Sequence, residues 1–183
     1  MRISKFLSYV LRHRPDTVGI ELDEGGWVDV DVLLAAARDH EPELTRGRLE
    51  EVVRSSDKQR FVLSDDGRRI RANQGHSVDV DLGLQPIEPP EQLFHGTAER
   101  FVDSIFTNGL ERRSRHHVHL SADVEVARAV GQRHGRVAIL RVASGAMQRD
   151  GLAFCRSDNG VWLTAHVAPR YLTRLPTGDP ERA

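Results

Sequence analysis

The sequence predicts an α+β chain of two lobes, and three observations lead to this prediction. Three helical patterns followed by a hairpin signal fill the first part, which is typical of a winged-helix-like lobe. A stretch at 82–90 with three prolines predicts an extended linker. Beyond it, short strand patterns alternate with short helices, which indicates a lobe with a β core. We therefore expect lobes at residues 1–80 and 93–176, a linker at 81–92 and a flexible tail at 177–183.

The helices of the first lobe follow from apolar spacing and capping residues. Apolar residues recur at spacings of three and four over 3–13, so a helix is expected there, and Pro15 should end it. Asp29 or Asp31 is expected to cap a second helix that runs to about His40. Its inward residues should be Val32, Leu33 and Ala36.

The rest of this lobe is a third helix and a hairpin. Thr45 should start the helix, with Leu49, Val52 and Val53 on one face. Ser64-Asp65-Asp66-Gly67 separates strand patterns at 60–63 and 69–72 and predicts a turn between two strands. Trp27-Val28 can form one more short strand.

The second lobe should begin with a strand at 93–95 that enters a turn at Gly96. A helix over 102–106 should stop at Gly109, and another over 124–130 should end at Gly131. Further strands are expected at 118–120, 137–142, 161–163 and 171–175.

Composition narrows the class of protein. The chain has 183 residues, of which 39% are hydrophobic and 29% charged, and its formal net charge is −1, as expected for a globular domain. No apolar run approaches the roughly 20 residues of a membrane helix, and the first helix does not resemble a signal peptide. The single cysteine, Cys155, excludes an intrachain disulfide and a cysteine-based metal cage. We expect a cytoplasmic protein.

Charge also limits how nucleic acid could bind. Residues 1–77 contain 13 Lys or Arg and 14 Asp or Glu, so this part is not basic. Nucleic acid would have to bind at a focused cluster and not over a broad basic face. Lys5 and Lys58 are the only lysines, and the remaining 24 basic residues are arginines, whose planar guanidinium groups match phosphate oxygens.

Polar residues that suit anion chemistry gather in a few short segments. They are Leu11 to Pro15, Ser56 to Phe61, Arg71 to Ser77, His95-Gly96-Thr97, Arg112 to Ser121 and Ser157 to Trp162. Each also has an ordinary interpretation, such as a basic helix end, a solvated strand end or a surface loop. Gly96 would let a ligand approach the backbone closely.

Together the segments suggest an anion held between the lobes. P-loop and Rossmann glycine patterns do not occur, which argues against those modes of nucleotide binding. His117 and His119 share a strand face, but no carboxylate or cysteine stands at a ligand spacing, so no metal is expected.

These strings, in their order along residues 3–172, resemble the RNA 2′-phosphotransferase family of KptA type. The matching strings are Leu7 to His13, Asp57 to Phe61, Gln74 to Ser77, His95 to Thr97, Gly109-Leu110, Arg115 to Ser121 and Asn159 to Leu163. One departure is Arg113, where the family often has methionine.

The resemblance implies an N-terminal winged-helix RNA lobe and a C-terminal ADP-ribosyltransferase-like lobe that binds NAD as co-substrate. It also implies two steps. The RNA 2′-phosphate attacks ribose C1″ and expels nicotinamide. Ribose O2″ then attacks phosphorus, which releases RNA with a 2′-hydroxyl and ADP-ribose 1″,2″-cyclic phosphate.

The resemblance further implies the site residues. The catalytic set would be Arg12, His13, Arg60 and Arg115, with the arginines clamping the 2′-phosphate and His13 binding it or donating a proton to the leaving oxygen. The NAD-binding set would be His95, Gly96, Thr97, His119, Ser121, Gln74, Gly75, His76 and Ser77, of which the last four would line the cleft. Val161 stands where many ADP-ribosyltransferases have a catalytic glutamate, and an ionised phosphate nucleophile needs no such base.

Two alternatives remain open. The first is an ADP-ribosyltransferase that modifies terminal phosphates of nucleic acid with the same residues. The second is a non-catalytic winged-helix protein, which would bind nucleic acid with a steep salt dependence and without NAD. No membrane association and no obligatory protein partner are expected.

Overall fold

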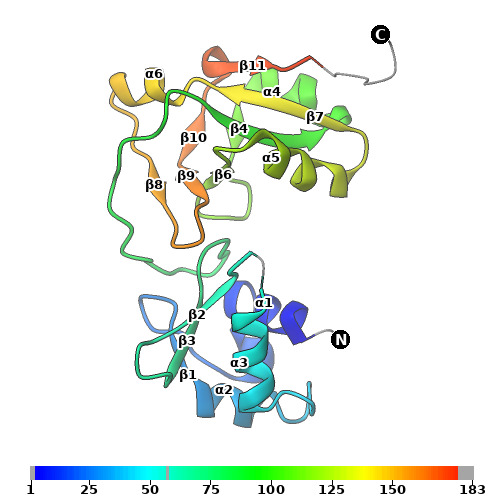
Figure 1. Ribbon diagram of the computed structural model, residues 1–183, viewed down its shortest axis with the longest axis vertical. Helices are drawn as coiled ribbons and strands as arrows, with labels where there is room; N and C mark the ends of the chain where they lie inside the picture. Colours follow the sequence, from blue (N-terminus) through cyan, green and yellow to red (C-terminus); the bar gives the residue numbers. More distant parts are fainter. Residues whose placement is uncertain (1–2, 57, 177–183) are drawn as a thin grey trace. The chain divides into compact units, whose positions relative to one another are not determined.

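The computed structural model describes residues 3–56 and 58–176, and its mixture of helices and antiparallel sheets confirms the α+β class (Figure 1). The chain divides into two compact units, Met1–Leu84 and Gln85–Ala183. The tail predicted to be flexible, 177–183, lies outside the described residues.

The first unit combines three α-helices with a small antiparallel sheet. Its helices are α1 (Ile3–Arg12), a 3-10 turn (Pro15–Val18), α2 (Val30–Ala37) and α3 (Arg46–Arg54). Its strands are β1 (Val28–Asp29), β2 (Phe61–Leu63) and β3 (Arg69–Ala72), in the order β1-β3-β2.

The predicted caps of these helices are confirmed. Asp29 Oδ1 accepts hydrogen bonds from the amides of Asp31 (2.8 Å) and Val32 (3.1 Å), and Thr45 Oγ1 accepts one from Arg48 (3.3 Å). Each bond satisfies an amide that the first helical turn leaves without a carbonyl partner.

One inward residue of α2 was predicted wrongly. Val32 is 53% exposed, and the buried residues are Val30, Leu33 and Ala37. These three follow the spacing of three and four from the first residue of the helix, so the buried stripe begins at Val30, between the two candidate capping residues. Leu33 and the α3 residue Leu49 then join Leu7, Leu11 and the other apolar residues of one core.

The second unit contains three small sheets and three α-helices. Its strands are β4 (Leu93–Ala98), β5 (Leu110–Glu111), β6 (Val118–Leu120), β7 (Val137–Val142), β8 (Cys155–Arg156), β9 (Trp162–Thr164), β10 (His166–Val167) and β11 (Leu172–Arg174). Its helices are α4 (Val102–Asn108), α5 (Val124–Gly131) and α6 (Ser144–Arg149). The sheet orders are β11-β7-β4, β6-β9-β8 and β10-β5, all antiparallel.

The turn predicted at Gly96 is wrong. Strand β4 continues through Gly96 to Ala98, and each of its residues pairs with β7. Helix α5 packs against β4 and β7 (Figure 1). A Cβ at Gly96 would lie 1.8 Å from the carbonyl oxygen of Ala127 in α5, so the glycine is there for close helix–strand contact.

The ends of the helices agree better with prediction. Helix α4 ends at Asn108, and Gly109 follows with φ of 87°, a conformation that glycine adopts easily. Helix α5 ends at Gly131 but continues as a 3-10 turn over Gln132–His134. Helix α6 and strands β5, β8 and β10 were not expected.

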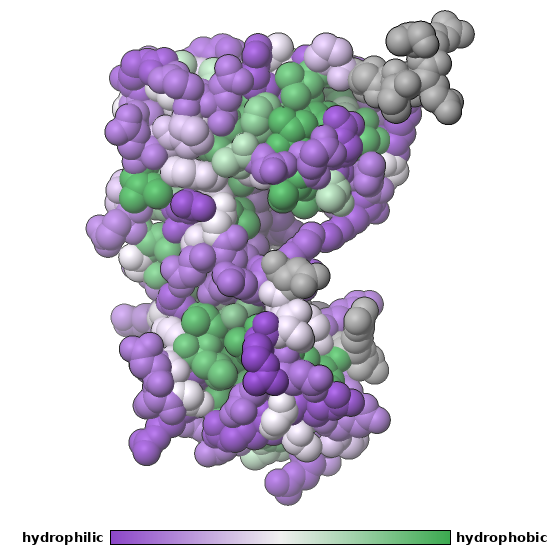
Figure 2. All heavy atoms as spheres, viewed as in Figure 1, coloured by the Kyte–Doolittle hydropathy of each residue, from purple (hydrophilic) through white to green (hydrophobic). Residues whose placement is uncertain are grey.

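A second core fills this unit, with Leu93, Leu140, Met147 and Phe154 among its buried members. On the face in Figure 2, hydrophobic side chains also gather over the α4–α5 region, where Phe106, Val126 and Val130 are exposed. No helix among the described residues is long and apolar enough to cross a membrane.

Candidate active site

In the first unit, the end of α1 contacts the loop that enters β2. Arg12 is the last residue of α1, and its Nη2 donates a hydrogen bond to the carbonyl oxygen of Arg60 (3.3 Å). Its guanidinium carbon lies 5.9 Å from the centre of the Phe61 ring. Two arginines that are 48 residues apart in sequence are thereby brought to one place.

His13 contacts a residue from a third segment. Its Nδ1 lies 2.9 Å from the hydroxyl oxygen of Ser77, and the amide of Ser77 donates to the carbonyl oxygen of Arg12 (2.8 Å). Ser77 therefore holds both the backbone at the end of α1 and the imidazole beside it. A fixed imidazole can present its Nε2 to a ligand at a defined position.

The backbone at Arg60 is fixed by Asn73, a residue that our site prediction did not include. The Asn73 side-chain amide donates to the carbonyl oxygen of Gln59 (2.5 Å). The Asn73 backbone amide donates to the carbonyl oxygen of Arg60 (3.0 Å). Gln59 has a φ of 40°, unusual for a residue other than glycine, so these bonds hold a strained turn. The buried Asn73 is thus a local support for Arg60.

The segment Gln74 to Ser77 divides between two surroundings. Gly75 has a φ of 88°, which turns the chain. His76 is buried inside the first unit, close to Gly26, and Ser77 is exposed beside His13. Ser77 therefore belongs with the Arg12, His13 and Arg60 cluster, and the NAD contacts expected of this segment stay a prediction.

In the second unit, three predicted site residues form a chain of hydrogen bonds. An Nη1 of Arg115 lies 3.3 Å from His119 Nδ1, and the carbonyl oxygen of His119 lies 3.0 Å from His95 Nδ1. Because Arg115 can only donate, His119 Nδ1 is the acceptor in the first contact. Arg115 is exposed in the turn before β6, and its partner His119 lies in that strand.

The second contact defines the state of His95. A carbonyl oxygen can only accept, so His95 Nδ1 carries the proton and Nε2 keeps its lone pair. Burial lowers the pKa of His95 below its ordinary value of 6.5, and the positive charges of Arg113 and Arg115 lower it further. His95 is therefore a neutral imidazole that offers an acceptor at Nε2.

The backbone polar groups of Gly96 point to the edge of β4 that does not pair with β7. Phe94 exchanges two hydrogen bonds with Ser121 (2.8 and 2.9 Å), so its N–H and C=O point away from β7. Backbone groups reverse direction at each residue of a strand, and Gly96 is two residues further on. Its N–H and C=O therefore also point away from β7, where an amide ligand could pair with them.

The remaining predicted residues have mainly local contacts. Thr97 is buried in β4, and Ser121 Oγ accepts a hydrogen bond from the amide of Asp123 (3.0 Å). Val161 lies in the turn before β9, where its carbonyl oxygen accepts from the amide of Ser157 (2.9 Å). The Arg113 guanidinium, at the departure from the family pattern, lies 5.0 Å from the centre of the Phe101 ring.

The predicted catalytic set is thus shared between the units. The structure brings Arg12, His13 and Arg60 together in the first unit, and it joins Arg115 to His119 and His95 in the second. Within residues 3–56 and 58–176, no three His, Cys, Asp or Glu side chains are grouped to hold a metal ion.

The chain is similar to known proteins of one family. The family model described as RNA 2′-phosphotransferase, Tpt1/KptA family, matches residues 1–166. A probable RNA 2′-phosphotransferase of Agrobacterium fabrum is 58% identical over 93% of this chain and 91% of its own length. A protein of Acaryochloris marina with the same description is 53% identical over 94% of this chain and 96% of its own length. One of Nostoc punctiforme, also so described, is 51% identical over 96% of this chain and 97% of its own length.

The α+β fold and these relatives together define a transferase enzyme. The chain belongs to the Tpt1/KptA family of RNA 2′-phosphotransferases, which remove a 2′-phosphate from RNA.

Proposed function

We propose that the chain uses NAD as co-substrate and passes an internal RNA 2′-phosphate to its ADP-ribose part. In this proposal the first unit is a winged-helix-like RNA-binding lobe and the second is an ADP-ribosyltransferase-like lobe that binds NAD. The observation that carries the proposal is the Arg12, His13, Arg60 and Ser77 cluster, because three segments distant in sequence meet there and bring two arginines and a histidine together.

Both chemical steps place negative charge on the transferred phosphate, and fixed guanidinium groups stabilise such charge. Arg12 and Arg60 bind the non-reacting phosphate oxygens, and Arg115 does the same from the second unit. Hydrogen bonds already orient the Arg12 and Arg115 side chains, and Asn73 holds the backbone of Arg60, so little reorganisation is needed as the charge changes.

In the first step, a 2′-phosphate oxygen bonds to C1″ and the bond from C1″ to nicotinamide breaks. Two features of β4 suit nicotinamide. The N–H and C=O of Gly96 can pair with its carboxamide, and the neutral His95 can accept a hydrogen bond from a ribose hydroxyl. The phosphate is ionised at neutral pH, so the step needs no general base.

In the second step, O2″ bonds to phosphorus, the bond from phosphorus to the RNA 2′-oxygen breaks, and a proton passes from O2″ to that oxygen. Ser77 holds the His13 imidazole where it can bind the phosphate and donate a proton to the leaving 2′-oxygen. We assign to it binding and positioning first, with proton donation as a second role.

NAD labelled in its nicotinamide ring tests the co-substrate assignment. Nicotinamide should be released when the RNA carries a 2′-phosphate, and not when the matched RNA carries a 2′-hydroxyl. Removal of RNA 2′-phosphate in the complete absence of NAD would refute the assignment.

A further inference from the structure

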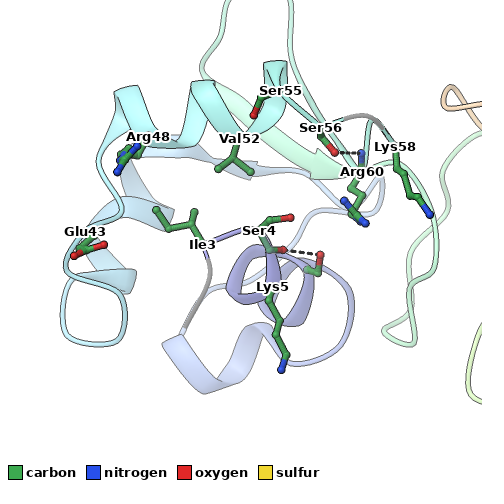
Figure 3. Close-up of a pocket in the computed structure, with 11 residues that line it drawn as sticks. Ile3, Ser4, Lys5, Glu43, Arg48, Val52, Ser55, Ser56, Lys58 and Arg60 are labelled. Atoms are coloured by element: carbon green, nitrogen blue, oxygen red, sulfur yellow. Dashed lines mark hydrogen bonds between the residues drawn. The ribbon is translucent and has the colours of Figure 1, made fainter. Parts of the chain in front are cut away.

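A hollow of about 760 Å³ in the first unit lies between α1 and α3 and has no role so far (Figure 3). It is lined by Ile3, Ser4, Lys5, Ser8, Glu43, Arg48, Val52, Ser55, Ser56, Lys58 and Arg60. We call it the α1–α3 groove. Arg60 belongs both to this groove and to the proposed 2′-phosphate cluster, so the two are continuous.

Helix α1 makes the same connection. Lys5, Ser8 and Arg12 are spaced by three and four residues and therefore share one face of the helix. Lys5 and Ser8 line the groove, and Arg12 contacts the loop of Arg60. At 1.5 Å per residue, Lys5 and Arg12 are about 10 Å apart along the axis. One helix face thus leads from the groove to the cluster.

The groove is positively charged at the end where Lys5 and Arg60 lie. Both lysines of the chain line it, although the other 24 basic residues are arginines. In the described part of the chain, Lys5 and the Arg60 side chain have no ion pair. At the other end, Arg48 is paired with Glu51 (2.9 Å) and Glu43 adds a negative charge, so the excess lies near Lys5 and Arg60.

The uncharged lining suits a sugar–phosphate chain. Ser4, Ser55 and Ser56 line the groove, and Figure 3 shows Ser56 beside Arg60. Ser56 Oγ accepts from the Arg60 amide (3.5 Å), which leaves its own proton for a phosphate oxygen. Ile3 and Val52 supply apolar contact for a ribose or base face.

We propose that the α1–α3 groove binds the phosphodiester backbone of the RNA strand next to the 2′-phosphorylated nucleotide. The inference rests on the proposed function and extends it, since it names where the substrate strand continues. Lys5 and Lys58 hold flanking phosphates, and Arg60 marks the point where the strand reaches the cluster. The enzyme should then prefer a longer strand over a minimal dinucleotide.

The test compares three substrates: a dinucleotide with an internal 2′-phosphate, and the same dinucleotide extended by three nucleotides on its 5′ or its 3′ side. One extension should raise kcat/KM for the wild type, and Lys5→Gln, Lys58→Gln and the double variant should lose most of this gain. Arg38→Gln is the matched control, because Arg38 is exposed in the same unit outside the groove, and it should keep the gain.

Salt dependence gives a second readout. Each contact with a single-strand phosphate contributes a slope of about −0.7 to the plot of log affinity against log salt. The double variant should therefore reduce the slope by about 1.4 for an RNA that spans the groove, and Arg38→Gln should leave it unchanged. An equal gain in the lysine variants, or no gain from either extension in the wild type, would overturn the proposal.

Failure of the proposed function is a separate outcome. If the wild type does not process the 2′-phosphorylated dinucleotide with NAD, the chemistry is wrong. Fluorescence anisotropy with an eight-nucleotide RNA that lacks a 2′-phosphate still measures the groove. Equal salt slopes for the wild type and the double lysine variant would then refute RNA binding in the α1–α3 groove, independently of the proposed reaction.

Discussion

Replacement of Gly96 by alanine separates two explanations of this glycine. The added Cβ would lie 1.8 Å from the carbonyl oxygen and 2.6 Å from the carbonyl carbon of Ala127. Both are backbone atoms of α5, so no side-chain rotation relieves the overlap, and the helix must move by more than an ångström. Overpacking of a core costs about 1–3 kcal/mol and more in severe cases. We expect Gly96→Ala to destabilise the second unit by at least about 3 kcal/mol.

Gly131→Ala is a graded comparison in the same contact. Its Cβ would meet Val137 Cγ2 at 2.7 Å and backbone atoms of Gly96 and Thr97 at 3.0 Å, so the expected loss is smaller, about 1–2 kcal/mol. Urea unfolding with hydrogen exchange over β4 and α5 measures both. A Gly96→Ala variant of normal stability that only binds NAD weakly would refute this reasoning and restore close ligand approach as the reason for the glycine.

Three further predictions concern side chains. Arg60→Ala should stay folded and bind NAD but lose turnover about 10²–10³-fold, because one preorganised cationic group is removed, and near-normal turnover would sink that role. Ser77→Ala should lower kcat/KM for RNA about tenfold, because the 2.9 Å contact to His13 is lost. If the two residues act together, adding Ser77→Ala to the His13→Ala variant should not lower kcat/KM any further. Burial lowers the pKa of His117 below 6.5, so the unfolded chain binds more protons and the free energy of unfolding should fall as pH falls through 6.5. His117→Asn should flatten this fall, and equal slopes would contradict it.

Short-range sequence patterns were sufficient to predict many of the helices and turns of the first unit. The apolar spacing of α1 and the capping side chains of Asp29 and Thr45 act within one or two helical turns, so the sequence alone predicts them. The turn at Gly67, with a φ of 68°, is another short-range feature.

The errors occurred where a distant segment decides the structure. Gly96 resembles a turn glycine until α5 is placed against it, and that contact spans about thirty residues of sequence. Helix α6 consists largely of small or polar residues, which give no apolar periodicity. It is fixed instead by tertiary contacts such as Ser144 Oγ to the Pro90 carbonyl oxygen (2.7 Å).

The candidate site shows the same division. Motifs indicated Arg12, His13, Arg60 and Ser77 as residues of interest, but no spacing rule says that His13 meets Ser77 across 64 positions. Asn73 stands in the polar segment Arg71 to Ser77 but was not among the predicted site residues, because its role is to support a backbone and not to touch a ligand. Its position beside a residue with positive φ was the signal that only the structure reveals.

The proposed reaction can be followed with a short RNA that carries one internal 2′-phosphate, incubated with the protein with and without NAD. We expect NAD-dependent loss of the 2′-phosphate, free nicotinamide and ADP-ribose 1″,2″-cyclic phosphate. ADP-ribose that stays attached to the RNA as the final product, or an unchanged RNA with intact NAD, would contradict it.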